Sequence, residues 1–200
     1  RAAVTVGGAS FLENDAIAAA IIYAVDNGAR ILNFSFGSPQ FSPLIRDAVR
    51  YAADAGVVLV AAVGNEGDEH VFYPARHNEC IAVAASDMNG RIMAFSNHGP
   101  SVDVAAPGDR IHSLAPGGRY TSLSGTSMSA GHVSGLAAVW LSHFPHLTPL
   151  QIRGAIASSS RDVGTAGWDA RSGAGIVRVP DQFLQEPLAV QLSIGETTTS

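Results

Sequence analysis

The most informative stretch of this chain is Gly125–Gly135, which reads Gly-Thr-Ser-Met-Ser-Ala-Gly-His-Val-Ser-Gly. Its small residues predict a turn, and the residues that follow predict a long apolar helix with Ser127 in the first turn. Unpaired backbone N–H groups and the helix dipole favour developing negative charge at such a position. Far upstream, the apolar run Val57–Val63 predicts a strand, and Asn65 follows it closely. The two segments together predict a serine nucleophile and an asparagine that donates to an oxyanion.

The first half of the chain alternates predicted strands and helices. Apolar residues at helical spacing predict a helix over Asn14–Asn27, capped by Asn14 and stopped by Gly28. A second helix opens with Ser42 and Pro43, the favoured order of cap and first helical residue. Strands are expected before, between and after these helices, over Ala2–Val6, Ile31–Phe36 and Val57–Val63 respectively. This order predicts an α/β fold in which parallel strands are joined by right-handed crossovers.

The second half continues with weaker signals. Further strands are expected over Cys80–Ala85, Arg91–Phe95, Val102–Ala105 and Arg110–Leu114, and helices over Ser127–His143 and Thr148–Ser158. Residues 1–185 are predicted to form one domain, and residues 186–200 a polar C-terminal tail or linker. No internal repeat is found.

Composition excludes two classes of protein. The chain has 200 residues, 46% of them hydrophobic, and a formal net charge of −5. It contains no run of the roughly 18 apolar residues that a membrane span requires. An acidic chain also lacks the basic stripe that nucleic acid demands. Charged residues are only 14%, which fits either a surface rich in Ala, Gly and Ser or a surface that is normally covered.

The lone cysteine and the first residue give limited information. Cys80 lies in an apolar run and is expected to be a small buried hydrophobe, without an internal disulfide partner. Residue 1 is arginine, so the sequence is not expected to begin at the start of a translated chain, and a signal peptide could have preceded it.

The block around Ser127 resembles the Gly-Thr-Ser-Met-x-x-Pro-His-Val-x-Gly signature of the subtilisin-like serine peptidases, with Gly131 where that signature has proline. Residues 31–37 and 58–67 resemble two further motifs of that family, Val-Ile-Asn-Met-Ser-Leu-Gly and Val-Ala-Ala-Ala-Gly-Asn-x-Gly. Three shorter matches occur in the family's order, namely Tyr73-Pro74-Ala75, Phe95-Ser96-Asn97-x-Gly99 and Val104-Ala105-Ala106-Pro107-Gly108. The chain thus resembles the C-terminal two-thirds of such a catalytic domain. The resemblance implies a three-layer α/β fold, a mostly parallel sheet flanked by helices, incomplete at its N-terminus.

The resemblance also implies roles for individual residues. Ser127 is expected to attack the scissile carbonyl, while the Asn65 amide and the Ser127 N–H hold the oxyanion. A peptide substrate is expected to lie as an added strand between two edges. These edges are Ser35-Phe36-Gly37 and Ala62-Val63-Gly64. Phe72 is expected at the floor of the pocket for the residue before the scissile bond, where it would favour small side chains; the alternative is a plain core residue.

No metal-binding residues are predicted. Catalysis of this kind needs no cofactor, although many members of the family hold structural calcium. The turn Ala75–Cys80 resembles a weak cation loop of backbone carbonyls, without an acidic cluster to support it. The spacing of His143 and His146 suggests zinc, but Pro145 breaks the helix and no other ligand is near in sequence. The expected partners are polypeptide substrates, and the resemblance implies secretion.

The sequence lacks a base for Ser127. Neither the Asp-Ser/Thr-Gly motif nor the His-Gly-Thr-His motif of the family occurs, and His132 matches a structural histidine. Three other histidines, His70, His77 and His112, are expected on surface loops. In the family, the aspartate strand lies between the strands that resemble Ala2–Val6 and Ile31–Phe36. The chain is therefore expected to pair with a missing N-terminal part of the same domain and to be inactive alone.

Two other functions stay open. A catalytically dead domain could bind peptides through the same cleft, but such a module needs neither Ser127 nor Asn65. An α/β-hydrolase esterase is a third reading; its nucleophile turn reads Gly-x-Ser-x-Gly, whereas Ser129 occupies the last position here.

Overall fold

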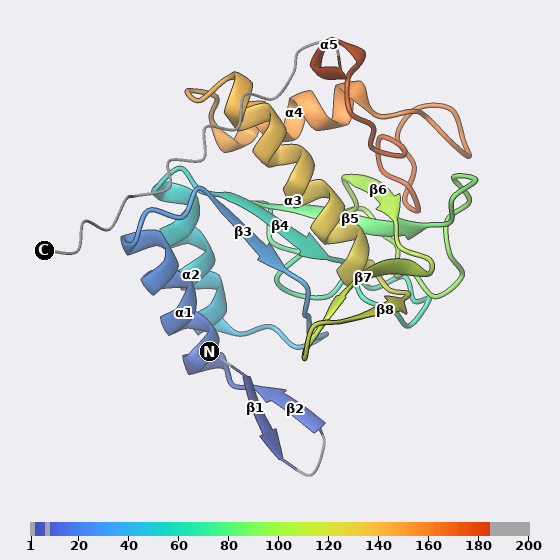
Figure 1. Ribbon diagram of the computed structural model, residues 1–200. Helices are drawn as coiled ribbons and strands as arrows, with labels where there is room; N and C mark the ends of the chain where they lie inside the picture. The colour runs from blue at the N-terminus through green and yellow to red at the C-terminus, as the bar shows by residue number, and fades with distance from the viewer. Residues whose placement is uncertain (1–2, 7–8, 185–200) are drawn as a thin grey trace, which may run out of the picture.

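The computed structural model describes residues 3–6 and 9–184 of the chain (Figure 1). Its centre is a parallel sheet with the strand order β3-β4-β5-β6. The strands are β3 Ile31–Phe34, β4 Val58–Ala62, β5 Cys80–Ser86 and β6 Val104–Pro107. Because all of them run in one direction, their carboxyl ends meet at one edge of the sheet.

Helices cover both faces of this sheet, as Figure 1 shows. Helices α1 (Asn14–Asp26) and α2 (Pro43–Asp54) lie together on one face. Helices α3 (Thr126–His143) and α4 (Pro149–Ser159) lie on the other. The result is the three-layer α/β arrangement that the sequence predicted.

Strand β4 shows how the sequence builds two cores from one sheet. All of its residues are buried, and alternate side chains point to opposite faces because the side-chain period of a strand is two residues. Leu59 and Ala61 join the core under α1 and α2. Val58 and Val60 join the core under α3 and α4. An unbroken apolar run is therefore what this position requires.

Capping residues set the helix starts. The Ser42 hydroxyl accepts from the Ile45 N–H at the start of α2, and Pro43 is the first helical residue. Thr148 and Gln151 form a reciprocal capping box at the start of α4. The expected cap at Asn14 is wrong, because Glu13 occupies the N-cap position of α1 and makes no side-chain capping bond.

The N-terminal strand is present but does not join the main sheet. Strand β1 (Ala3–Val6) pairs antiparallel with β2 (Ala9–Leu12), and the resulting hairpin projects from the domain (Figure 1). Within the described residues, β3 is consequently an edge strand of the parallel sheet. No strand was expected over β2, because a run of four residues is too short to show a clear periodicity.

In a second hairpin, the first strand was expected from the sequence and the second was not. Strands β7 (Ile111–Ala115) and β8 (Arg119–Leu123) form a two-stranded antiparallel sheet beside the start of α3. Every residue of β8 is exposed, so the sequence of β8 has no buried face whose apolar residues would indicate a strand. The segment expected over Arg91–Phe95 makes only an isolated bridge, between Ile92 and Ser86.

The C-terminal region holds one more short helix, α5 (Asp181–Leu184). The predicted tail, residues 186–200, lies outside the described residues. In the part of the chain that the structure describes, none of the helices is both long and apolar enough to span a membrane.

His77 departs from the expectation of a surface histidine. Its ring packs against Tyr73 and Phe41, with centroid distances of 4.9 and 6.1 Å, and only 9% of the residue is exposed. Its Nε2 atom is buried without a hydrogen-bond partner among the described residues. Burial lowers the pKa of His77, while the nearby charges of Glu79 and Arg46 raise and lower it respectively. Nothing local in the sequence indicates this burial.

The lowered pKa of His77 predicts a dependence of stability on pH. Because the folded protein disfavours the charged ring, the unfolded chain takes up the extra proton as the pH falls below the ordinary value of about 6.5. The free energy of unfolding therefore decreases toward acid. His77→Phe keeps the aromatic packing without the titrating group, so it should lose less stability than wild type between about pH 7 and pH 5. Urea unfolding measures this, with the exposed His146→Phe as the control; equal losses in His77→Phe and wild type would contradict it.

Candidate active site

The candidate site lies where the carboxyl ends of β3 and β4 meet the start of α3. Phe34 pairs with Ala61 in the parallel register, so the segments that follow the two strands leave the sheet as neighbours. In open parallel sheets, ligands bind at this edge. Hydrogen bonds from Thr126 and Ser127 at the start of α3 reach both segments. Ser127 and Asn65, predicted from separate parts of the sequence, thus come from adjoining segments of one edge.

Thr126 fixes the orientation of the Asn65 amide. The Asn65 Oδ1 atom accepts from the Thr126 N–H at 2.8 Å and lies 3.0 Å from the Thr126 hydroxyl, which is fully buried. A backbone N–H can only donate, so the atom facing it must be the amide oxygen. The Nδ2 group therefore points away from Thr126. Within the described residues, neither the Asn65 Nδ2 group nor the Ser127 main-chain N–H makes a hydrogen bond. Two donors on adjoining segments are thus left without partners in the part of the chain that the structure describes.

Ser127 and Ser35 form a reciprocal pair of hydrogen bonds. The Ser127 hydroxyl donates to the Ser35 carbonyl at 3.0 Å, and the Ser35 hydroxyl donates to the Ser127 carbonyl at 2.8 Å. Asn33 donates from Nδ2 to the Ser35 hydroxyl at 2.7 Å and accepts from the Ser134 hydroxyl at 2.9 Å. This chain of bonds ties the first turns of α3 to the end of β3, and it fixes the position of Ser127.

Among the described residues, the Ser127 hydroxyl has no histidine or carboxylate partner. The nearest histidine in sequence, His132, turns its Nδ1 atom to the Met128 carbonyl one helical turn earlier, at 3.1 Å. A peptide carbonyl such as that of Ser35 accepts a hydrogen bond but is too weak a base to remove the hydroxyl proton. Deprotonation of Ser127 needs a group beyond those that surround it here.

The predicted substrate edges lie close together. A Cβ atom built on Gly37 would lie 3.1 Å from the Phe72 Cβ atom, so the Phe72 side chain lies directly against Gly37. The Phe72 N–H donates to the Val63 carbonyl at 2.9 Å, and the Val63 N–H donates to Val83 at 3.3 Å. Ala62 and Val63 are buried. Val63 therefore has both main-chain groups paired inside the protein and no exposed surface, so in this structure it has no free group to offer a substrate.

Cavities adjoin Ser127 and the predicted edge. One, of about 380 Å³, lies between the start of α3 and the β7–β8 hairpin, and Ser127, Met128 and Leu123 help to line it. A second, of about 100 Å³, is lined in part by Phe36 and Gly37. The Phe36 ring also packs edge-on against Phe34, with ring centroids 5.7 Å apart. Cavities large enough for a side chain therefore lie beside Ser127 and beside the predicted substrate edge at Phe36 and Gly37.

The turn Ala75–Cys80 offers few free carbonyls to a cation. The Asn78 carbonyl accepts from the Arg153 guanidinium at 2.7 Å, and the His77 carbonyl accepts from the Cys80 N–H at 3.0 Å. Arg153 also pairs with Asp103. In the described ranges, no group of three or more His, Cys, Asp or Glu side chains is placed to hold a metal. Two carbonyls of this turn are therefore already engaged within the protein.

Sequence reasoning missed three residues that shape the site. Thr126 orients the Asn65 amide, and Glu66 and Asn97 hold the turn that carries Asn65. Thr126 and Asn97 lie inside the motifs Gly-Thr-Ser and Phe-Ser-Asn-x-Gly, which were recognised as patterns. Their roles depend on contacts between segments far apart in the chain, so the motifs alone carried no signal for them.

Comparisons with known proteins agree with this geometry. The sequence model described as the subtilase family matches residues 2–175. The chain is 38% identical to fervidolysin of Fervidobacterium pennivorans, over 96% of this chain and 30% of that protein. It is 38% identical to subtilisin DY of Bacillus licheniformis, over 82% of this chain and 60% of that protein. A thermostable alkaline protease of Halalkalibacterium halodurans is 43% identical, over 74% of this chain and 41% of its own length.

Solved structures show the same likeness in three dimensions. Sphericase superposes with a TM-score of 0.80 at 33% identity, covering 86% of this chain and 66% of its own. The prenylagaramide maturation protease PagA superposes with a TM-score of 0.78 at 30% identity, covering 87% of this chain and 68% of its own. The chain spans between 30% and 60% of the length of the three curated relatives named above. By sequence and by fold, the chain belongs to the subtilase family.

Proposed function

We propose that the protein is a serine endopeptidase that hydrolyses peptide bonds through an acyl-enzyme on Ser127. The observation that carries the proposal is the arrangement at the start of α3. There the Asn65 amide is held by Thr126, and its Nδ2 group and the Ser127 N–H are left without partners among the described residues. Such donors stabilise the negative oxygen of a tetrahedral intermediate. The names of the relatives, subtilisin and alkaline protease among them, support the same activity.

In this proposal, Ser127 Oγ attacks the scissile carbonyl and its proton passes to a base. The carbonyl oxygen becomes the oxyanion that Asn65 and the Ser127 N–H receive. As the intermediate collapses, the C–N bond breaks and the base returns the proton to the departing amine, while the acyl group stays on Ser127. Water then gives a proton to the same base and attacks the acyl carbon, which releases the acid as the proton returns to Ser127 Oγ. We infer that the base is a histidine, oriented by an aspartate, and that both come from residues upstream of Arg1. The 200-residue chain alone is then inactive.

The edge of β3 supports an upstream partner segment. Its outer side has no strand partner within the described residues, and a largely apolar cavity of about 170 Å³ adjoins it. Leu32, Phe34 and Phe36 line this cavity together with residues of α1. An unpaired apolar edge strand is costly to leave in water. A strand from the N-terminal part of the same domain would pair there and carry the aspartate toward Ser127.

A catalytically dead peptide-binding domain is the second candidate. The missing base partner of Ser127 favours it. The oriented Asn65 amide argues against it, because a module that only binds peptides has no use for an oxyanion hole. A location outside the cytoplasm and a structural calcium ion are further proposals that family membership alone supports; calorimetry with calcium and with chelator would test the second.

The upstream sequence is the first test. The coding region before Arg1 is expected to contain an Asp-Ser/Thr-Gly motif followed by His-Gly-Thr. A continuous upstream reading frame that lacks both motifs would leave Ser127 without a base and make the binding module the better reading.

Covalent labelling tests the nucleophile. A fluorophosphonate probe is expected to label the natural full-length chain at Ser127, and Ser127→Ala abolishes labelling and peptide hydrolysis. Asn65→Ala should keep the fold and lower kcat by about 10²–10³, a value borrowed from the loss of the equivalent donor in subtilisin. Labelling that persists in Ser127→Ala, or a full-length chain that is never labelled, would refute the proposed mechanism.

Peptide profiling tests the role of Phe72. If its ring shortens the pocket for the residue before the scissile bond, the full-length enzyme prefers Ala there, and Phe72→Gly shifts the preference toward Phe and Leu. Phe144→Gly, which removes a ring just beyond the far end of α3, should keep the wild-type preference. A wild-type enzyme that already prefers Phe or Leu would show that Phe72 does not limit the pocket.

A further inference from the structure

Asn97 lies buried under the turn that carries Asn65. It is fully buried, and both ends of its side-chain amide are satisfied. Its Oδ1 atom accepts from the N–H groups of Glu66 and Asp68, at 2.8 and 3.2 Å. Its Nδ2 group donates to the Glu66 carboxylate at 2.9 Å and to the His70 carbonyl at 3.0 Å. One side chain therefore fixes the main chain of residues 66–70.

Glu66 connects this network to Asn65. Its Oε2 atom accepts from the Asn65 main-chain N–H at 2.7 Å as well as from Asn97. The Asn97 main-chain N–H also donates to the Gly64 carbonyl at 3.1 Å. Asn65 thus has polar contacts at two places. Its side-chain oxygen is held by Thr126, and its main chain is held by Glu66.

Gly64 shows how closely the turn and the network are packed. Its φ is 111°, a conformation that side chains rarely adopt. A Cβ atom built there would collide with the Asn97 amide, and it would lie 2.9 Å from the Glu66 carboxylate. The turn before Asn65 therefore rests directly on Asn97, with no room for adjustment between them.

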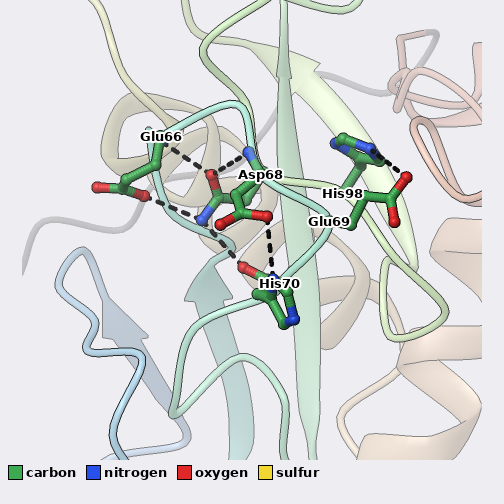
Figure 2. Close-up of polar contacts among 6 residues, drawn as sticks. Glu66, Asp68, Glu69, His70 and His98 are labelled. Carbon is green, nitrogen blue, oxygen red and sulfur yellow. Dashed lines mark hydrogen bonds and ion pairs between the residues drawn. The ribbon is translucent and has the colours of Figure 1, made fainter.

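Figure 2 shows this network together with the two ion pairs of the same loop, whose side chains belong to Asp68, His70, Glu69 and His98. Asp68 pairs with His70 at 2.9 Å, and the hydrogen bond from His70 lowers the pKa of Asp68. Glu69 lies 4.0 Å from His98, and the side chain of Glu69 is 85% exposed. Among the described residues, neither pair makes a hydrogen bond to Asn65. Of the three carboxylates in this loop, Glu66 alone reaches the main chain of Asn65.

We propose that Glu66 and Asn97 are positioning residues for the oxyanion donor Asn65. Asn97 holds the Glu66 carboxylate, and Glu66 holds the Asn65 main chain, so that the Nδ2 group stands ready before substrate binds. When hydrogen-bond donors are already in position, no free energy is needed to reorient them during the reaction. This inference rests on the proposed peptidase function, but neither the activity nor the family requires it.

Kinetics of the natural full-length chain test the proposal. Glu66→Ala should lower kcat by about tenfold, with KM within about twofold, because a misplaced donor acts on the transition state. Glu66→Gln keeps an oxygen for the Asn65 N–H and should recover most of this loss. Glu69→Ala removes the same charge from the same loop and should leave kcat unchanged. A loss in Glu69→Ala equal to that in Glu66→Ala would overturn the proposal, since the effect would then be one of charge alone.

A double-mutant cycle tests whether Glu66 acts through Asn65. In an Asn65→Ala background, Glu66→Ala should cause no further loss of kcat, because no donor remains to be positioned. A tenfold loss in both backgrounds would overturn the proposal and assign Glu66 a general structural role.

A crystal structure of the Glu66→Ala full-length chain separates this inference from the proposed function. A displaced Asn65 amide supports positioning by Glu66, even if the wild-type chain hydrolyses no peptide and the peptidase proposal fails. An Asn65 amide that stays bound to Thr126 in its original place overturns the inference, whatever the activity. Asn97→Asp keeps the size of the side chain but cannot donate to Glu66, so it should displace Asn65 in the same way.

Discussion

Strand β4 lies between two layers of helices, and every one of its side chains is buried. Its neighbours β3 and β5 pair with it in parallel, so the backbone of β4 is satisfied on both sides. A strand enclosed in this way cannot slip by one residue, since a slip would exchange the two cores that its alternate side chains fill. The end of β4 is therefore a fixed point. The turn Gly64–Asn65 is attached to it, and the rest of the site is built around that turn.

Helix α3 is placed by the same constraint. Its buried face packs on β3, β4, β5 and β6, which brings its first turn over the carboxyl edge of the sheet. Thr126 then meets Asn65, and Ser127 meets Ser35. Neither contact joins residues that are near in sequence. Both follow from the packing of α3 on the sheet.

The turn around Asn65 and the outer edge of β3 differ in how many of their polar groups are hydrogen-bonded. Around Asn65, the groups of Thr126, Glu66 and Asn97 form a connected set of hydrogen bonds. Along the outer edge of β3, the described residues leave main-chain groups unpaired beside an apolar cavity. The comparisons show the family, and they also show a chain that spans only part of its relatives' length. The physical contrast between the tightly bonded turn and the open edge agrees with that partial coverage.

The sequence alone determined the elements whose signals are local. The apolar run of β4, the Ser42-Pro43 start of α2 and a helix over Thr148–Ser158 were all predicted, because each depends on periodicity or on capping within a few residues. Motif resemblance also placed Ser127 and Asn65 at one edge of the sheet. Tertiary structure decided what depends on distant neighbours: the separate β1–β2 hairpin, the burial of His77 and the Glu66–Asn97 network beneath Asn65. Periodicity reports which face of an element is apolar, but it cannot report which polar side chain from another segment will fill the space beneath a turn.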